Sequence, residues 1–147
     1  MPRVRVVLDT NILVSALITK NTPPDELYQA WLRNDIELVT SDAQIDEVTD
    51  VLARPRLRKY VDSDEAAQMV AAIHRHAIVL SGVPVTKRSP DPKDDPILAV
   101  AVIGNAELVV SGDRSDMLAL GDVEGIPILS AREALSIALK AKSSDDA

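Results

Sequence analysis

The chain has no cysteine, only two histidines and very few aromatic residues, and each shortage argues against a class of site. Without cysteine there is no disulfide and no thiolate metal site, and two histidines are too few to favour a zinc enzyme. No phenylalanine, one tryptophan and two tyrosines argue against a platform on which nucleic acid bases stack. Any metal would therefore be a hard cation bound by oxygen, such as Mg²⁺ or Mn²⁺.

Long apolar runs and an excess of positive charge are also missing. No run approaches the length of about 18 residues that a membrane span needs. Met1-Pro2-Arg3 leads into a strand-like segment without an apolar signal region, so we expect a cytoplasmic protein with no membrane partner. Sixteen basic against twenty-three acidic residues give a net charge of −7, which argues against binding nucleic acid by bulk electrostatics.

The 147 residues present suffice for one domain, and 46% of them are hydrophobic. We predict a single domain over 1–141 and a polar, frayed tail over 142–147. Short β-branched runs predict strands at Val4–Leu8, Ile36–Thr40, Ile78–Leu80, Glu107–Ser111 and Pro127–Leu129. Helical segments separate them, which predicts an α/β fold: a central, mostly parallel sheet of four to five strands between two helical layers.

Several helical segments carry signals of their own. Ser41 and Gln44 have the spacing of a capping box and predict a helix start. Tyr28 and Trp31, three residues apart, predict a helix anchored in the core or at a partner interface. His74 and His76 are two apart, so on a helix they point in different directions and we interpret them as structural.

Acidic residues gather where predicted strands end and helices begin. They are Asp9, Glu47, the group Asp91, Asp94 and Asp95, and the pair Asp113 and Asp116. Each has a structural explanation when taken singly, as a helix cap, as favourable charge at a helix N-terminus or as a solvated side chain. Three of the four places, however, lie where a parallel sheet collects its ligand-binding loops. Carboxylates brought together there would repel one another unless a divalent cation lay among them.

Four segments, in this order along the chain, carry a family resemblance. They are Val7–Leu13, Ile45–Val48 with Val51–Pro55, Asp91–Asp95 with the following Ile97, Leu98 and Ala101, and Leu108–Asp113. The first and last resemble the opening and fourth motifs of PIN-domain ribonucleases. The middle two resemble the second and third acidic segments of the branch that supplies toxins of toxin–antitoxin pairs.

The resemblance implies a PIN-like three-layer fold and a metal-dependent endoribonuclease. It implies Mg²⁺ or Mn²⁺ as cofactor, RNA as substrate, an antitoxin protein as partner and a homodimer. Carried over residue by residue, it assigns Asp9, Glu47, Asp94 and Asp113 as catalytic, metal-binding acids. Asn11 would orient Asp9 or a water on the metal, and Ser111 would support the same site.

The chain departs from the family pattern at two points. The third segment offers the adjacent acids Asp94 and Asp95; Asp94 leaves Ile97 and Ala101 at the usual offsets, and Asp95 stays open as the alternative. In the fourth segment Asp116 follows Asp113 by three residues where this branch more often shows two. Its role as an auxiliary metal ligand therefore stays open.

Basic residues near these acids could contact an RNA backbone. They are the cluster Arg54, Arg56, Arg58 and Lys59, and Lys93 beside the third acidic segment. The alternative is favourable charge at a helix C-terminus for the cluster and a solvated loop residue for Lys93.

Two other classes of function remain as alternatives. One is a non-catalytic PIN-fold module that binds RNA or protein. The other is a phosphoacceptor signalling domain, which also has an aspartate at a strand end but calls for an acidic pair at the first strand and a lysine after the last. The five glycines form neither a P-loop nor a dinucleotide fingerprint.

Overall fold

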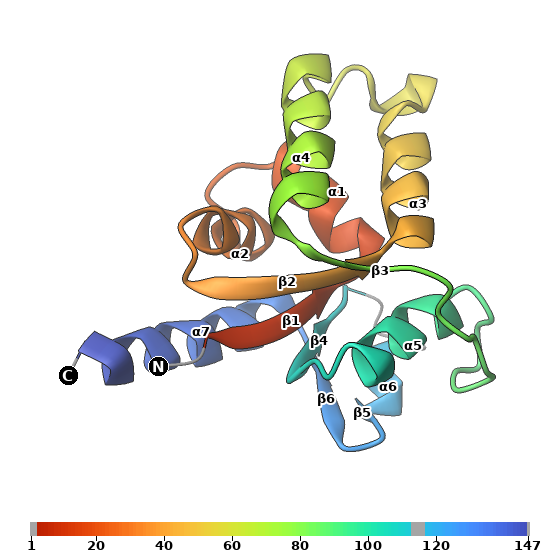
Figure 1. Cartoon of the computed structure of the whole chain (residues 1–147). Helices are drawn as coiled ribbons and strands as arrows, with labels where there is room; N and C mark the ends of the chain where they lie inside the picture. The colour runs from red at the N-terminus through yellow and green to blue at the C-terminus, as the bar shows by residue number, and fades with distance from the viewer. Residues whose placement is uncertain (1–2, 113–116, 147) are drawn as a thin grey trace.

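The computed structural model describes residues 3–112 and 117–146 of the chain, with side chains to residue 140 (Figure 1). Its elements are β1 (Val4–Leu8), α1 (Thr10–Ile18), α2 (Pro23–Leu32), β2 (Ile36–Ser41), α3 (Asp42–Leu52), the 3₁₀ helix η1 (Pro55–Leu57), α4 (Ser63–His76), β3 (Ile78–Leu80), α5 (Asp95–Ile103), β4 (Leu108–Val110), α6 (Met117–Leu120), β5 (Asp122–Val123), β6 (Ile126–Leu129) and α7 (Ala131–Asp146).

The strands form one sheet in the order β3-β2-β1-β4-β6-β5. β1 pairs in parallel with β2 and with β4, β2 with β3, and β4 with β6. Only the pairing of β5 with β6 is antiparallel among the described strands. The predicted α/β class with a mostly parallel sheet is therefore confirmed.

The helices cover both faces of the sheet because the chain reverses its direction across it. From β1 through β2 to β3 the strands are added on one side of β1, and from β4 onward on the other. Right-handed crossovers place the helices of these two halves on opposite faces. Figure 1 shows α1 to α4 on one side of the sheet and α5 with α6 on the other. The reversal point, between β1 and β4, is where an open α/β sheet forms its ligand crevice.

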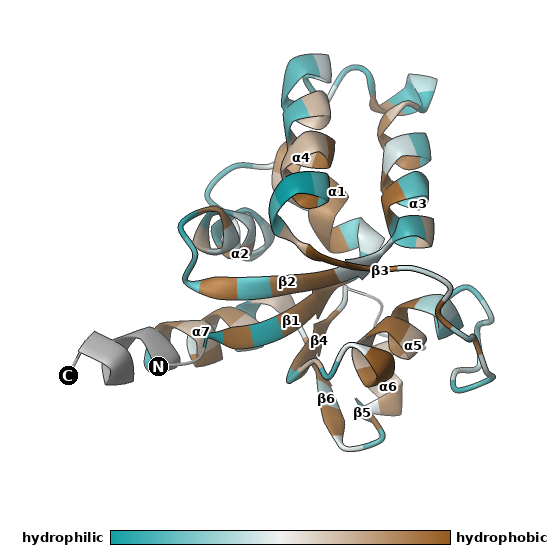
Figure 2. Cartoon of the chain, viewed as in Figure 1, coloured by the Kyte–Doolittle hydropathy of each residue, from teal (hydrophilic) through white to brown (hydrophobic). Residues whose placement is uncertain are grey.

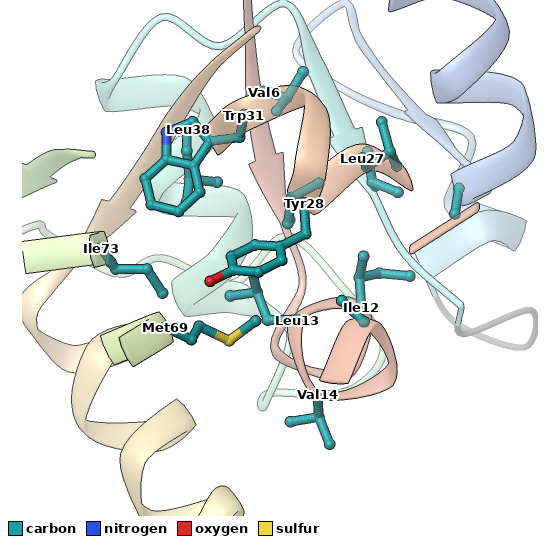
Figure 3. Close-up of a cluster of buried hydrophobic side chains, with 14 of the residues drawn as sticks. Val6, Ile12, Leu13, Val14, Leu27, Tyr28, Trp31, Leu38, Met69 and Ile73 are labelled. Carbon is teal, nitrogen blue, oxygen red and sulfur yellow. The ribbon is translucent and has the colours of Figure 1, made fainter. Parts of the chain in front are cut away.

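Alternation along the strands fills two apolar cores. Val6 and Leu8 of β1 pack with α1 to α4 and α7, whereas Val7 between them packs with α5. Figure 2 shows apolar residues along these central strands and over most of α5. In the larger core the buried Tyr28 and Trp31 have ring centroids 5.9 Å apart (Figure 3). They anchor α2 in the core, which is the first of the two predicted alternatives.

One detail of the predicted fold was wrong, the number of strands. The described residues contain six strands rather than four or five, because β5 forms a hairpin with β6 through Glu124 and Gly125. Both turn residues have positive φ, 46° and 85°, and glutamate gives no sequence signal for that conformation. At the other end, the backbone of α7 is helical to Asp146, and the predicted frayed tail over 142–147 stays a prediction.

Within the described part of the chain, no helix combines the length and apolar composition needed to cross a bilayer.

Candidate active site

Asp9 lies at the reversal point of the sheet, between the end of β1 and the first residue of α1. Its backbone N–H donates to the carbonyl oxygen of Val110 at the end of β4, at 2.9 Å. Its carboxylate accepts a hydrogen bond of 3.1 Å from the hydroxyl of Ser111, which follows β4. The side chain occupies the N-cap position of α1 without making a capping hydrogen bond. The Asp9 side chain is thus joined to the fourth motif, 102 residues away, while its backbone carbonyl accepts from the N–H of Ile12 at 2.9 Å in the first turn of α1.

Burial raises the pKa of the Asp9 carboxyl above its ordinary value of 3.8, because only 8% of the residue is exposed. The hydrogen bond from Ser111 and the nearby N–H of Thr10 lower this pKa, and the negative charge of Glu47 raises it again. Burial has the largest effect. A cation bound here would offset both the cost of burying the Asp9 charge and the repulsion between the two carboxylates.

Glu47 reaches this region from α3, which begins after Ser41. The predicted cap is present: the N–H of Gln44 donates to the Ser41 hydroxyl oxygen at 3.1 Å. Glu47 follows one turn later and is exposed. It lines a small cleft of about 100 Å³ together with Lys93 and Pro96, from the segment that begins α5. The second and third acidic segments therefore face one opening.

The two adjacent acids of the third segment differ in what they contact. Asp95, 5% exposed, accepts two backbone hydrogen bonds on one carboxylate oxygen, from the N–H groups of Arg88 at 2.9 Å and Ser89 at 2.8 Å. It thereby fixes the preceding loop onto the start of α5. Asp94 is half-buried at the N-cap position and makes no capping hydrogen bond with its side chain. Asp95 therefore has a structural role in holding this loop, and the choice of Asp94 as the third acid stays a prediction.

Asp113 and Asp116 lie outside the described residues, so their predicted places stay predictions. Among the residues whose side chains the structure describes, no three histidine, aspartate or glutamate side chains are grouped so as to hold a metal ion. What these residues do bring together is Asp9 with Ser111, with Glu47 near enough to affect the pKa of Asp9. Asn11 is exposed on the first turn of α1, next to Asp9.

The predicted RNA contacts fall in two places. Lys93 lines the cleft beside Glu47. The exposed cluster of Arg54, Arg56, Arg58 and Lys59 surrounds η1, in the connection at the far end of α3 and α4 from the sheet (Figure 1). At 1.5 Å per helical residue, Arg54 is roughly 10 Å along the α3 axis from Glu47. An extended backbone could reach both places, but only Lys93 lies at the cleft.

From the sequence, Gln44 is predicted only as half of a capping box. In the structure its side chain is buried and donates a hydrogen bond to the carbonyl oxygen of Leu8, the residue before Asp9. The one signal in the sequence is a glutamine at the third position of a helix, and that spacing predicts a local contact, not one 36 residues away.

Comparison with known proteins assigns the chain to a family. A family model described as "PIN domain" matches residues 5–115, which is most of the chain and includes every motif named above. The chain therefore belongs to the PIN domain family, whose members are typically nucleases that use divalent metals. It is similar to the "Uncharacterized protein MJ1680" of Methanocaldococcus jannaschii, with 26% identity over 121 residues, 82% of this chain and 77% of that protein.

The raised pKa of Asp9 predicts a pH dependence of stability without metal. A folded-state pKa above the unfolded value means that protonated Asp9 stabilises the fold. This contribution is complete below about pH 3.8 and is lost as pH rises through the folded-state pKa. We expect the free energy of unfolding of the wild type, relative to Asp9→Asn, to fall as pH is raised toward neutrality in the presence of chelator. Urea titrations across that range measure it, and a difference that stays constant with pH would contradict the cause assigned here.

Proposed function

We propose that this protein is a metal-dependent endoribonuclease that hydrolyses phosphodiester bonds in RNA, and that it is the toxin of a toxin–antitoxin pair. The observation that carries the proposal is the buried Asp9 carboxylate at the reversal point of the sheet, electrostatically coupled to Glu47. Membership of the PIN domain family supports the nuclease activity. The order of the four motifs supports the toxin branch, and with it the antitoxin partner and the homodimer.

The donor set fits Mg²⁺ or Mn²⁺. Asp9 and Glu47 would contribute to holding the ion. Asp94, which the described residues do not group with them, and Asp113, which lies outside those residues, would complete the predicted set; all four offer the oxygen donors that hard cations prefer. Such an ion, when bound, lowers the pKa of a water molecule and stabilises charge on phosphate oxygens. The raised pKa of Asp9 shows that the protein environment disfavours a bare carboxylate at this position.

The remaining groups act on the carboxylates and the substrate. The Ser111 hydroxyl donates to Asp9 and so fixes the rotation of its carboxyl group. Asn11 extends from the next turn of the chain with an amide that would hold a water or an RNA oxygen. Lys93, at the cleft beside Glu47, supplies positive charge for a phosphate in a protein of net charge −7. RNA would therefore approach at the cleft between α3 and α5.

Chelation tests the activity directly. We expect the purified protein to cleave single-stranded or looped RNA with Mg²⁺ or Mn²⁺, and to lose this activity in excess chelator because the acids alone cannot activate water. Adding Mn²⁺ back should restore cleavage, with product formation followed on denaturing gels. Full cleavage in chelator would contradict the metal mechanism. RNA binding without cleavage at saturating Mn²⁺ would instead indicate the non-catalytic binding module.

A further inference from the structure

Gln44 connects three elements next to the acids, and we propose that it is a positioning residue that fixes Glu47 relative to Asp9. The inference rests on the proposed metal-dependent function and names a residue that neither the motif set nor the family match assigns. Gln44 is 4% exposed and lies on the first turn of α3.

The hydrogen bonds of Gln44 use both ends of its amide. Its Nε2 group donates to the carbonyl oxygen of Leu8 at 2.6 Å, and its Oε1 atom accepts from the hydroxyl of Thr40 at 2.6 Å. The backbone N–H of the same residue donates to Ser41. One side chain thus links the end of β1 to the junction of β2 and α3. An amide buried with both ends paired has one orientation, since any other leaves a polar atom unsatisfied.

The link lies where the two strands have stopped pairing. The register of β1 with β2 runs from Val4 opposite Ile36 to Val6 opposite Leu38, whereas the register of β1 with β4 reaches Leu8. Beyond Val6, therefore, the sheet ladder does not set the distance from β1 to the start of α3. The Gln44 amide supplies the connection there.

Asp9 and Glu47 lie at opposite ends of the link that Gln44 forms between β1 and α3. Asp9 directly follows Leu8, whose carbonyl accepts the hydrogen bond. Glu47 is three residues after Gln44, and side chains at that spacing lie on neighbouring turns of one helix face. Both Gln44 and Glu47 line the cleft that also contains Lys93. A shift or rotation of α3 would move Glu47 away from Asp9, and the Gln44 amide resists that shift.

The test measures Mn²⁺ binding by calorimetry without RNA, and RNA cleavage in parallel. Gln44→Met keeps the length and burial of the side chain and removes both amide hydrogen bonds. We expect its Mn²⁺ affinity to fall about 10-fold or more, the range typical of a lost outer-shell partner of a metal site. Thr49→Val is the matched control, because it also removes a side-chain hydrogen bond on α3, of 2.8 Å to the Ile45 carbonyl, at a position that lines a pocket with α4. Its Mn²⁺ affinity should equal that of the wild type.

Thr40→Val gives a second measurement that does not depend on the folding of Gln44→Met. This variant retains the Gln44–Leu8 hydrogen bond but removes the bond from Thr40 to the Gln44 Oε1 atom. Its Mn²⁺ affinity should therefore fall less than that of Gln44→Met. In the double variant the two losses should not add, because both act through one link.

The outcomes separate this inference from the proposed function. Wild-type Mn²⁺ affinity in both Gln44→Met and Thr40→Val would overturn the positioning role while leaving nuclease activity in place. Weakened Mn²⁺ binding in Gln44→Met, with a wild-type protein that cleaves no RNA, would support the positioning role and contradict the nuclease. A wild-type protein that binds no Mn²⁺ would overturn both.

Discussion

Asp9→Asn should abolish RNA cleavage while leaving the protein folded. Even an outer-shell partner of a metal ligand is worth about 10–100-fold in affinity or activity, so loss of a ligand itself should cost more than about 100-fold. Stability should be retained, because the asparagine oxygen can still accept the hydrogen bond from Ser111 and a neutral amide avoids the burial cost of the carboxylate. Single-turnover cleavage rates and urea unfolding of the same samples measure the two effects.

Asp46→Asn is the matched control. It removes the same charge from an exposed position directly before Glu47. A general change in the electrostatic potential around the cleft would therefore affect Asp46→Asn and Asp9→Asn alike. We expect its cleavage rate to equal that of the wild type. Equal loss in both variants would mean that net negative charge, and not a ligand at Asp9, governs the activity.

The same variants test the toxin role. Expression of the wild-type chain alone should arrest growth, and expression of Asp9→Asn should not, because arrest would come from RNA cleavage. Growth curves after induction are the measurement. Harmless overexpression of a chain that cleaves RNA in vitro would count against the toxin assignment and leave the nuclease assignment standing.

Asp94→Asn should reduce activity far more than Asp95→Asn. Asp94→Asn should lose cleavage to an extent similar to Asp9→Asn, with little change in unfolding free energy. Asp95→Asn should keep most of the activity, since an amide oxygen can still accept from the backbone N–H groups of Arg88 and Ser89. Initial cleavage rates at saturating Mn²⁺ would distinguish the two acids.

Asp95→Ala completes this comparison by removing the acceptor altogether. Hydrogen bonds to a charged group contribute about 1.5–3 kcal/mol each, so the free energy of unfolding should fall by at least about 2 kcal/mol. If Asp95→Ala loses cleavage because it unfolds, the cleavage should return at low temperature, where most of the protein is folded. Lost cleavage in a stable Asp95→Asn protein, with Asp94→Asn active, would identify Asp95 as the third ligand instead.

Local pattern was enough to predict most elements of this fold. Short β-branched runs between helical segments predicted parallel strands, and the capping-box spacing at Ser41 predicted a helix start that the structure contains. The hairpin of β5 and β6 was missed, because its turn depends on a positive φ at Glu124 that no local preference favours.

In the candidate site, too, some features followed from local pattern and others depended on the tertiary structure. A parallel sheet collects its crossover loops at one edge, so the position of Asp9 after the first strand already pointed to the crevice. That Asp95 accepts the N–H groups of the loop before α5 depended on the path of that loop. The spacing of Asp94 and Asp95 contains no information about that path.

The sequence by itself determined the fold class and the order of the motifs, because composition and local periodicity carry them, and it predicted an oxygen-bound cation. Only the tertiary structure decided that Ser111 donates to Asp9, that Asp95 holds a loop and that Gln44 joins α3 to the end of β1. The physical reason is that a local pattern specifies which element forms and which face is buried. The partner of a polar side chain, by contrast, is set by where distant segments meet once the two cores have packed.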